Sequence, residues 1–224
     1  DNKKIVVKGG MREQVNTALD KIECILKTAG ASLSDATHVT ENITIKGLDY
    51  YSEYEKVRIE RLPKNINKQL LVVDSLLRPD ALIELEIRVE KGLDYTENNV
   101  ITLPTLTPSH TVDRNDVVAQ TLDVYEQAQK ILESAGFDLS DIVKTVDHIT
   151  PEGLKDYKYT GKVRKEKLGP IYPGATGILM SKVSKDNSLI SVNITAAKGE
   201  KQSINPGWER YQKLTYSPAV KCGG

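Results

Sequence analysis

The chain has 224 residues and no net charge, because 31 lysine and arginine residues balance 31 aspartate and glutamate residues. That balance gives no reason to expect binding to nucleic acid or to an anionic membrane, and no apolar run approaches the roughly 20 residues that a membrane span needs. Two cysteines, Cys24 and Cys222, do not make a disulfide framework, which favours a soluble protein of the reducing cytoplasm.

In the first half of the chain, a short strand at Lys4–Lys8 is expected to lead into an amphipathic helix. The apolar residues that follow Gln14 recur at helical spacing, and Gly30 comes directly after the last of them, where a glycine can end a helix. Ala36–Ile45 is rich in Thr, Val and Ile and predicts a strand. The other predicted elements are a helix at about Tyr50–Arg61, ended by Pro63, and strands at Leu70–Val73 and Ala81–Val89.

The second half of the chain repeats the first. Gln14–Thr44 aligns with Gln120–Thr150 without a gap, which indicates two copies of one structural unit. We therefore expect a first repeat at 1–94, a linker rich in Thr, Pro and Asn at 95–110, a second repeat at 111–198, and a tail at 199–224. The predicted elements of the second repeat are helices at Val117–Ser134 and Pro151–Leu168 and strands at Ile142–Thr150, Thr176–Lys182 and Leu189–Ala197.

Four stretches share features with one known family. They are the run from Gln14 to Asp35 with its IL, AG and LSD motifs, the strand Leu82–Ile87, the segment Tyr172–Thr176, and Tyr216–Val220. In that order they resemble the Q…aG.sL.Dvv pattern, the closing LIEIE strand, the P-x-R-T stretch and the opening YS-x-A-V of the RidA/YjgF family, the enamine/imine deaminases and their relatives. The resemblance covers most of the chain.

The resemblance implies two tandem α+β units of the chorismate-mutase-like type, each a mostly antiparallel sheet with two helices on one face. It also implies a homo-oligomer, a trimeric or pseudo-trimeric assembly of such units. The hairpin that opens a family unit is missing from both repeats, and we expect the tail strand Leu214–Lys221 to complete the first repeat's sheet. A fragment whose lost residues come from a second polypeptide is the alternative.

Family members are thought to hold the substrate carboxylate with an arginine and a hydrolytic water with a glutamate, while a tyrosine completes the pocket. Carried over, the glutamate corresponds to Glu84, the tyrosine to Tyr216, and the arginine falls near Lys68 and Gln69; the second copy has Ala175 for the arginine and Ser191 for the glutamate. The resemblance thus implies catalytic roles for Glu84 and Tyr216 and substrate binding by Lys68 or Gln69. The simpler alternatives are a solvated strand carboxylate, a packing aromatic and an exposed loop lysine.

The leading prediction is a hydrolytic deaminase of small enamine or imine acids, or a related C–N hydrolase, with its site at a repeat interface. No cofactor is expected, because water and a carboxylate can hydrolyse a reactive imine, and no metal, because the histidines share no ligand spacing. The alternative is a non-catalytic ligand-binding or assembly module with decayed sites. A third reading, an amide or ring hydrolase, would need a Ser–Lys pair facing the cleft, for which Ser75, Ser181 and Lys182 are available.

Overall fold

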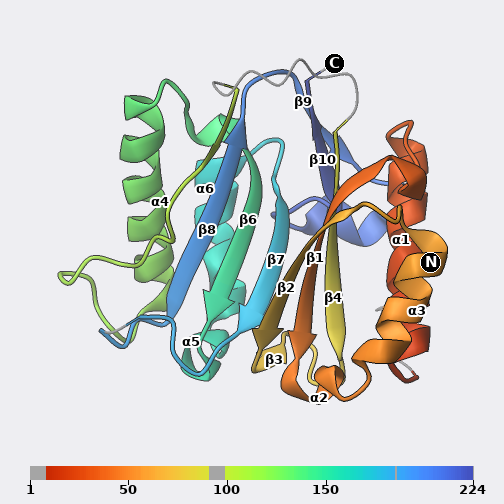
Figure 1. Ribbon diagram of the computed structural model, residues 1–224. Helices are drawn as coiled ribbons and strands as arrows, with labels where there is room; N and C mark the ends of the chain where they lie inside the picture. Colours follow the sequence, from red (N-terminus) through yellow and green to blue (C-terminus); the bar gives the residue numbers. More distant parts are fainter. Residues whose placement is uncertain (1–8, 91–98, 185, 224) are drawn as a thin grey trace. The chain divides into compact units, whose positions relative to one another are not determined.

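The computed structural model describes residues 9–90, 99–184 and 186–223, and the strand expected at Lys4–Lys8 lies outside these ranges. The chain forms two compact units, Asp1–Leu93 and Asp94–Gly224, which run from red to yellow and from green to blue in Figure 1. Each unit combines helices with a β-sheet, so the predicted α+β class is confirmed. No helix of the described segments has the length and apolar character needed to cross a bilayer.

The first unit is a three-stranded sheet with two long helices packed on one face. β1 lies in the middle, parallel to β2 and antiparallel to β4. The helical crossover between β1 and β2 allows the parallel pairing, which a tight turn cannot make. The elements are α1 (Met11–Thr28), β1 (Ala36–Thr44), α2 (Ile45–Leu48), α3 (Tyr51–Arg61), β2 (Asn67–Val73), β3 (Ser75–Leu76) and β4 (Ile83–Val89).

The second unit repeats this order and adds strands. β6 is parallel to β7 and antiparallel to β8, β8 pairs in turn with β5, and β9 and β10 form an antiparallel pair. The elements are β5 (Val100–Thr102), α4 (Val117–Ser134), β6 (Ile142–Ile149), α5 (Pro151–Leu154), α6 (Gly161–Leu168), β7 (Gly174–Leu179), β8 (Ile190–Ala197), β9 (Lys201–Ile204) and β10 (Ala219–Cys222).

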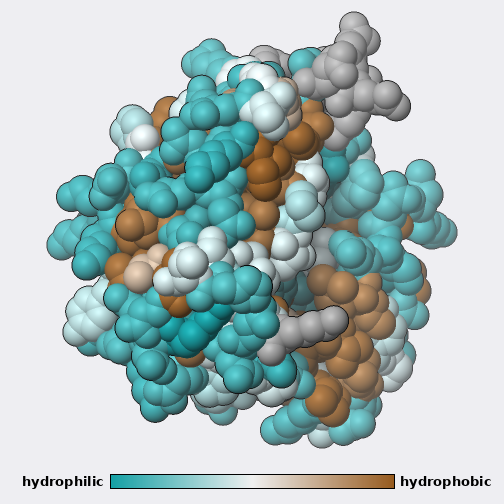
Figure 2. Space-filling view, turned by 90° about the vertical axis from the view of Figure 1, so that its left-hand side faces the viewer, coloured by the Kyte–Doolittle hydropathy of each residue, from teal (hydrophilic) through white to brown (hydrophobic). Residues whose placement is uncertain are grey.

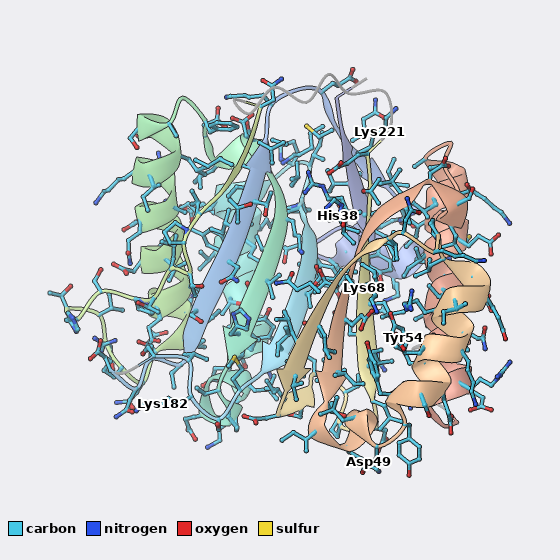
Figure 3. The ribbon with its side chains drawn as sticks, in the orientation of Figure 1. His38, Asp49, Tyr54, Lys68, Lys182 and Lys221 are labelled. Atoms are coloured by element: carbon cyan, nitrogen blue, oxygen red, sulfur yellow. The ribbon has the colours of Figure 1, made fainter. Side chains whose placement is uncertain are left out.

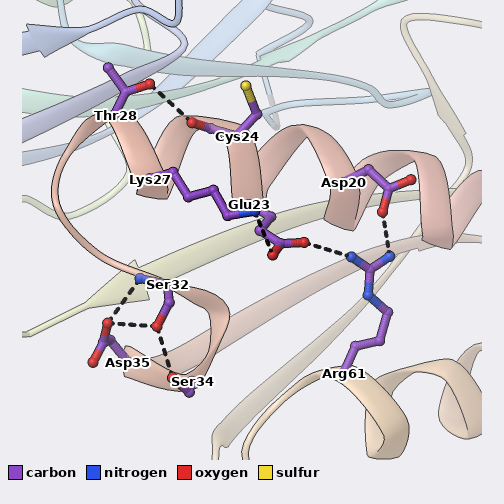
Figure 4. Close-up of polar contacts among 9 residues, drawn as sticks. All are labelled: Asp20, Glu23, Cys24, Lys27, Thr28, Ser32, Ser34, Asp35 and Arg61. Atoms are coloured by element: carbon purple, nitrogen blue, oxygen red, sulfur yellow. Dashed lines mark hydrogen bonds and ion pairs between the residues drawn. The ribbon is translucent and has the colours of Figure 1, made fainter.

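The junction between long helix and middle strand is built the same way in both units. α1 and α4 are each followed by a glycine of positive φ, 75° at Gly30 and 78° at Gly136, a conformation that glycine adopts without strain. The carboxylate of Asp35 then accepts a hydrogen bond from Ser32 N at 2.9 Å (Figure 4). Asp141 makes the same bond in the second unit. The matched glycine and LSD motifs are therefore structural.

A glutamine in the first turns of each long helix ties that helix to the segment before the last strand of the repeat. Gln14 Oε1 accepts a hydrogen bond from Leu82 N at 2.9 Å, and Gln120 Oε1 accepts one from Leu189 N at 2.8 Å. These bonds join residues far apart in the sequence. The alignment of Gln14 with Gln120 therefore reflects a shared structural role.

The core of the first unit lies between the sheet and its helices. Arg61, at the end of α3, holds α1 through Asp20, with Nη1 2.7 Å from Oδ1, and through Glu23, with Nη2 3.2 Å from Oε2 (Figure 4). This ion-pair cluster fixes the two helices side by side over the sheet. Beneath it lie fully buried side chains from α1, β1 and α3: Met11, Val15, Leu19, Ile43, Tyr54 and Val57.

Two predicted elements need correction at the corner after the middle strand, one a strand and one a helix. The strand predicted to reach Ile45 ends at Thr44, whose Oγ1 accepts a hydrogen bond from Gly47 N at 3.0 Å and so caps the short helix α2. The helix predicted over Pro151–Leu168 is interrupted, because Thr150 caps α5 in the same way and a 3-10 turn separates α5 from α6. Apolar periodicity does not reveal a cap that depends on one threonine.

Two segments outside the repeats contain strands, one in the predicted linker and one in the tail. Val100–Thr102, assigned from sequence to the linker, is strand β5, because its β-branched residues pair with β8. The tail does form a strand, Ala219–Cys222, and this strand pairs with β9 of the same unit. That the predicted tail strand Leu214–Lys221 completes the first repeat's sheet stays a prediction.

Candidate functional site

The sheet of the first unit has one face under the helices and one turned away from them, which we call the outer face. Ile43 of β1 and Ile83 of β4 belong to the core, so their neighbours Asn42 and Glu84 lie on the outer face. The register of β1 and β4 pairs Asn42 directly with Glu84, and Glu86 follows two positions along β4. Three polar side chains thus come together on one surface.

Asn42 and the two glutamates form the polar centre of the outer face. The Asn42 side chain is 0% exposed, and its Nδ2 donates a hydrogen bond to Glu86 Oε1 at 3.2 Å. Glu84 and Glu86 are half-buried. Ionised carboxylates only accept hydrogen bonds, so this surface can bind a water or an N–H group and can take up a proton. A catalytic role for Glu84 stays a prediction, and its neighbours Asn42 and Glu86 were not among the site residues predicted from the sequence.

The sequence contained a signal for one of the two missed residues. Side chains of a strand alternate between its faces, so the spacing of Glu84 and Glu86 in LIELEIRV already places both carboxylates on one face. Asn42 gave no comparable signal, because its position opposite Glu84 depends on the register between two strands that the sequence does not reveal.

Lys68 lies on the other face of the sheet from Glu84. It is on β2 (Figure 3) and pairs in register with the core residue Val39, and its Nζ reaches α3, 3.2 Å from Glu55 Oε1. That hydrogen bond, together with one from Arg58, holds the pKa of the Glu55 carboxyl below its usual value. The predicted role of Lys68 as the anchor of the substrate carboxylate stays a prediction.

Gln69, the second residue matched to the family arginine, lies on the same face as Glu84. The register pairs Gln69 with Thr40, the outer-face residue two positions before Asn42. The Gln69 side chain is exposed, and its amide can donate to a carboxylate. The one-residue ambiguity in the alignment thus corresponds to opposite faces of the sheet.

Tyr216, the predicted catalytic tyrosine, belongs to the second unit. It is half-buried and packs edge-on against Tyr211, with ring centroids 5.7 Å apart, and Tyr211 in turn stacks near Trp208. This arrangement matches the packing role that was the simpler alternative for Tyr216. A catalytic role for this tyrosine stays a prediction.

The second unit has the same outer face with different side chains. Ser191 stands at the position of Glu84 and Asn193 at that of Glu86, while His148 pairs with Ser191 in register. Ser191 is only 2% exposed. These two positions therefore hold no carboxylate, and the imidazole of His148 is the group that lies opposite Ser191. The two outer faces thus differ in the chemistry of their side chains.

On the helix side, the middle strand of the first unit buries a carboxylate. Glu41 is 0% exposed and accepts hydrogen bonds from Tyr54 Oη at 2.6 Å and Tyr51 Oη at 2.8 Å. Burial, and then the hydrogen bond to Glu41, raise the pKa of both tyrosines. The tyrosines therefore stay protonated and act as donors to the carboxylate.

The second unit buries Asp147 at the same position and gives it different partners. Tyr157 Oη donates to Asp147 at 2.6 Å, and the guanidinium of Arg164 pairs with the same oxygen. Asp147 is 1% exposed and Arg164 is 6% exposed. Both carboxylates lie under helices rather than on the outer face, so we assign them to folding and not to chemistry.

The remaining candidates gain little support. Ser75 lies on β3 of the first unit, while Ser181 and Lys182 are exposed residues that follow β7 in the second (Figure 3). Within the described residues, no three His, Cys, Asp or Glu side chains lie together as a metal site. A cleft of about 460 Å³ at the start of α1 contains none of the four predicted site residues; it is lined by Gly9, Gly10, Met11, Gln14, Lys46, Tyr50, Glu53, Asp80 and Leu82.

Comparisons with known proteins identify relatives of part of the chain. A RutC family protein of Pyrococcus abyssi is 35% identical over 81 residues, which are 36% of this chain and 62% of that protein. A RutC family protein of Sulfurisphaera tokodaii is 32% identical over 87 residues, 39% of this chain and 68% of the relative. No family model matches the chain. The chain thus spans less than two thirds of the Pyrococcus abyssi relative.

Solved structures with some likeness each cover about half of the chain. The YjgF gene product of E. coli is 23% identical, with a TM-score of 0.40, and the match covers 50% of this chain and 87% of that one. RidA of an Antarctic Psychrobacter species is 21% identical, with a TM-score of 0.41, over 45% of this chain and 81% of that one.

Proposed function

Since the chain belongs to the RutC family, the RidA/YjgF family of the sequence resemblance, we propose that it is a cofactor-independent hydrolytic deaminase of small enamine or imine acids. The observation that carries the proposal is the outer face of the first unit, where Glu84 lies directly opposite the buried amide of Asn42. We propose a small-molecule substrate, a cytoplasmic location, and a cleft completed where repeats meet.

The proposed reaction uses Glu84 as a general base. Water gives a proton to Glu84 while its oxygen bonds to the carbon of the C=N group, and the electron pair of that double bond moves to nitrogen. Return of that proton to nitrogen gives a carbinolamine. Glu84 then takes the proton of the new hydroxyl group and passes it to nitrogen, the C–N bond breaks as the oxygen electron pair forms the carbonyl, and ammonia leaves. Gln69, exposed on the same face, is proposed to donate a hydrogen bond to the substrate carboxylate.

Ammonia release from imines freshly generated from amino acids tests the proposal. We expect release above the buffer control, and a fall in kcat of about 10²–10⁴-fold in Glu84→Gln, the usual contribution of a positioned general base. Glu60→Gln is the matched control, because Glu60 is a surface residue of α3 that is 61% exposed. Release equal to the buffer control would contradict the proposal and favour the non-catalytic module.

We also propose that the protein is a homo-oligomer of trimeric or pseudo-trimeric symmetry. β2 is the edge strand of its sheet in the first unit, and three consecutive apolar residues on it remain exposed, Leu70 by 43%, Leu71 by 38% and Val72 by 52%. Figure 2 shows apolar side chains gathered in patches on the face it draws. Apolar edge strands favour association with another chain, which supports an assembly.

A further inference from the structure

Asn42 has an amide oxygen that the fold of the first unit does not use. The side chain is 0% exposed, and within the described residues Oδ1 receives no hydrogen bond. The opposite end of the amide donates to Glu86, which fixes Oδ1 as the acceptor. Buried acceptors are nearly always paired, so an unpaired one indicates a donor from water or a ligand.

A water molecule that donates a hydrogen bond to Asn42 Oδ1 can also reach the carboxylate of Glu84. Asn42 and Glu84 are directly opposite in the antiparallel pair β1–β4 and point to the same face. Side chains at such positions have Cβ atoms about 4.5–5.5 Å apart, so one water molecule can contact both. A carboxylate has room for this bond beside others, because it accepts several hydrogen bonds.

We infer that Asn42 is a positioning residue, whose Oδ1 holds the hydrolytic water together with the carboxylate of Glu84. The inference rests on the proposed function. A water that donates one hydrogen to Asn42 and the other to Glu84 has a lone pair left to attack the C=N carbon. Its second proton moves to Glu84 as the C–O bond forms, so Asn42 itself exchanges no proton and acts by orientation.

The second repeat provides a matched control. Asn193 lies on the outer face of that unit, and its Oδ1 also receives no hydrogen bond within the described residues. Two positions away, Ser191 replaces the carboxylate, so a water at Asn193 has no carboxylate opposite it of the kind that Glu84 offers at Asn42. Replacement of Asn193 therefore removes a similar side-chain amide that has no part in the proposed hydrolysis at Glu84.

The test combines kinetics with a crystal structure of the full chain. We expect Asn42→Leu to lower kcat by about 100-fold, the usual result of a misplaced reacting group, with KM changed less than two-fold. Asn42→Asp keeps an acceptor but adds a negative charge beside two carboxylates, which raises the pKa of the base and moves the acid limb of the kcat profile to higher pH. Asn193→Leu should leave kcat and the pH profile unchanged.

Melting curves of each variant exclude loss of folding, and Asn42→Ser replaces Asn42→Leu if the latter fails to fold. The crystal structure should show a water bonded to both Asn42 Oδ1 and Glu84. Absence of that water, or a kcat and pH profile unaltered in both Asn42 variants of an active protein, overturns the inference. If the water is present but the wild-type protein releases no ammonia, the proposed function fails and the water site stands.

Discussion

At the scale of single residues, the buried Glu41 carboxylate depends on two tyrosine hydroxyls. Tyr54→Phe removes the shorter of the two hydrogen bonds and leaves part of a buried carboxylate without a donor. Loss of one partner of a buried polar group costs about 1–3 kcal/mol, so we expect the free energy of unfolding in urea to fall by that amount. Tyr50→Phe is the control, because Tyr50 is 43% exposed; equal effects of the two changes would contradict the role of Glu41.

The Lys68–Glu55 pair makes a small contribution to stability that depends on pH. Its hydrogen bond lowers the pKa of Glu55 in the folded state, so the stabilisation is present above the unfolded pKa of about 4.3 and is lost as pH falls through the folded value. Lys68→Met should therefore destabilise by about 0.5 kcal/mol at pH 7, the usual contribution of an exposed pair, and by less at pH 3. Thermal melts at both pH values measure the difference, and Lys56→Met, the same substitution at an exposed lysine of α3, is the control. A loss of stability that is larger at pH 3 than at pH 7 would refute the prediction.

At the scale of elements, the corner between β1 and α2 needs glycine because it packs against the segment before β4. A Cβ at Gly47 would lie 2.4 Å from Leu82 O, a clash with backbone rather than with a movable side chain. Gly47→Ala should destabilise by about 1–3 kcal/mol, the usual cost of overpacking. Gly161→Ala, whose Cβ would lie 3.7 Å from Thr215 Oγ1, is the control; similar melting temperatures for the two variants would contradict this account.

The long helices and the turns that end them were predictable from the sequence, because the residue patterns that indicate them lie within each element. The stripes of α1 and α4, and the glycines and LSD turns that follow them, depend on residues close in sequence. Short elements were missed where a single long-range contact decides the structure. β5 is three residues long and exists through its pairing with β8. α2 was missed for a different reason, because its cap by Thr44 is local but gives no apolar periodicity.

The candidate site was only partly predictable for the same reason. Alternation along β4 fixed the face of Glu84, but the sequence did not give the register that places Asn42 opposite it. It also left Lys68 and Gln69 equivalent, although strand geometry puts them on opposite faces. A motif can name the residues of a sheet site, whereas pairing between strands decides which of them meet.

At the scale of the whole molecule, assembly is expected to depend on the exposed apolar residues of β2. Val72→Lys places a charge on the edge strand at a residue that is 52% exposed, so the fold of the isolated chain has little reason to change. We expect light scattering to report a smaller mass for this variant than for the wild-type oligomer. Ile59→Lys, at a 52% exposed position of α3, is the control; an unchanged mass for Val72→Lys would rule out assembly through this edge.

The different partners of the two buried carboxylates limit how the gene can recombine. Tandem copies invite unequal crossing-over, which would join the middle strand of one copy to the following helix of the other. In one such hybrid Glu41 would meet Thr160 in place of Tyr54 and lose the shorter of its two tyrosine hydrogen bonds, and in the other Asp147 would face Arg58 in place of Arg164. Each half is thus fitted to its own buried carboxylate, and a hybrid would have to rebuild the hydrogen bonds of that carboxylate with side chains placed for a different one.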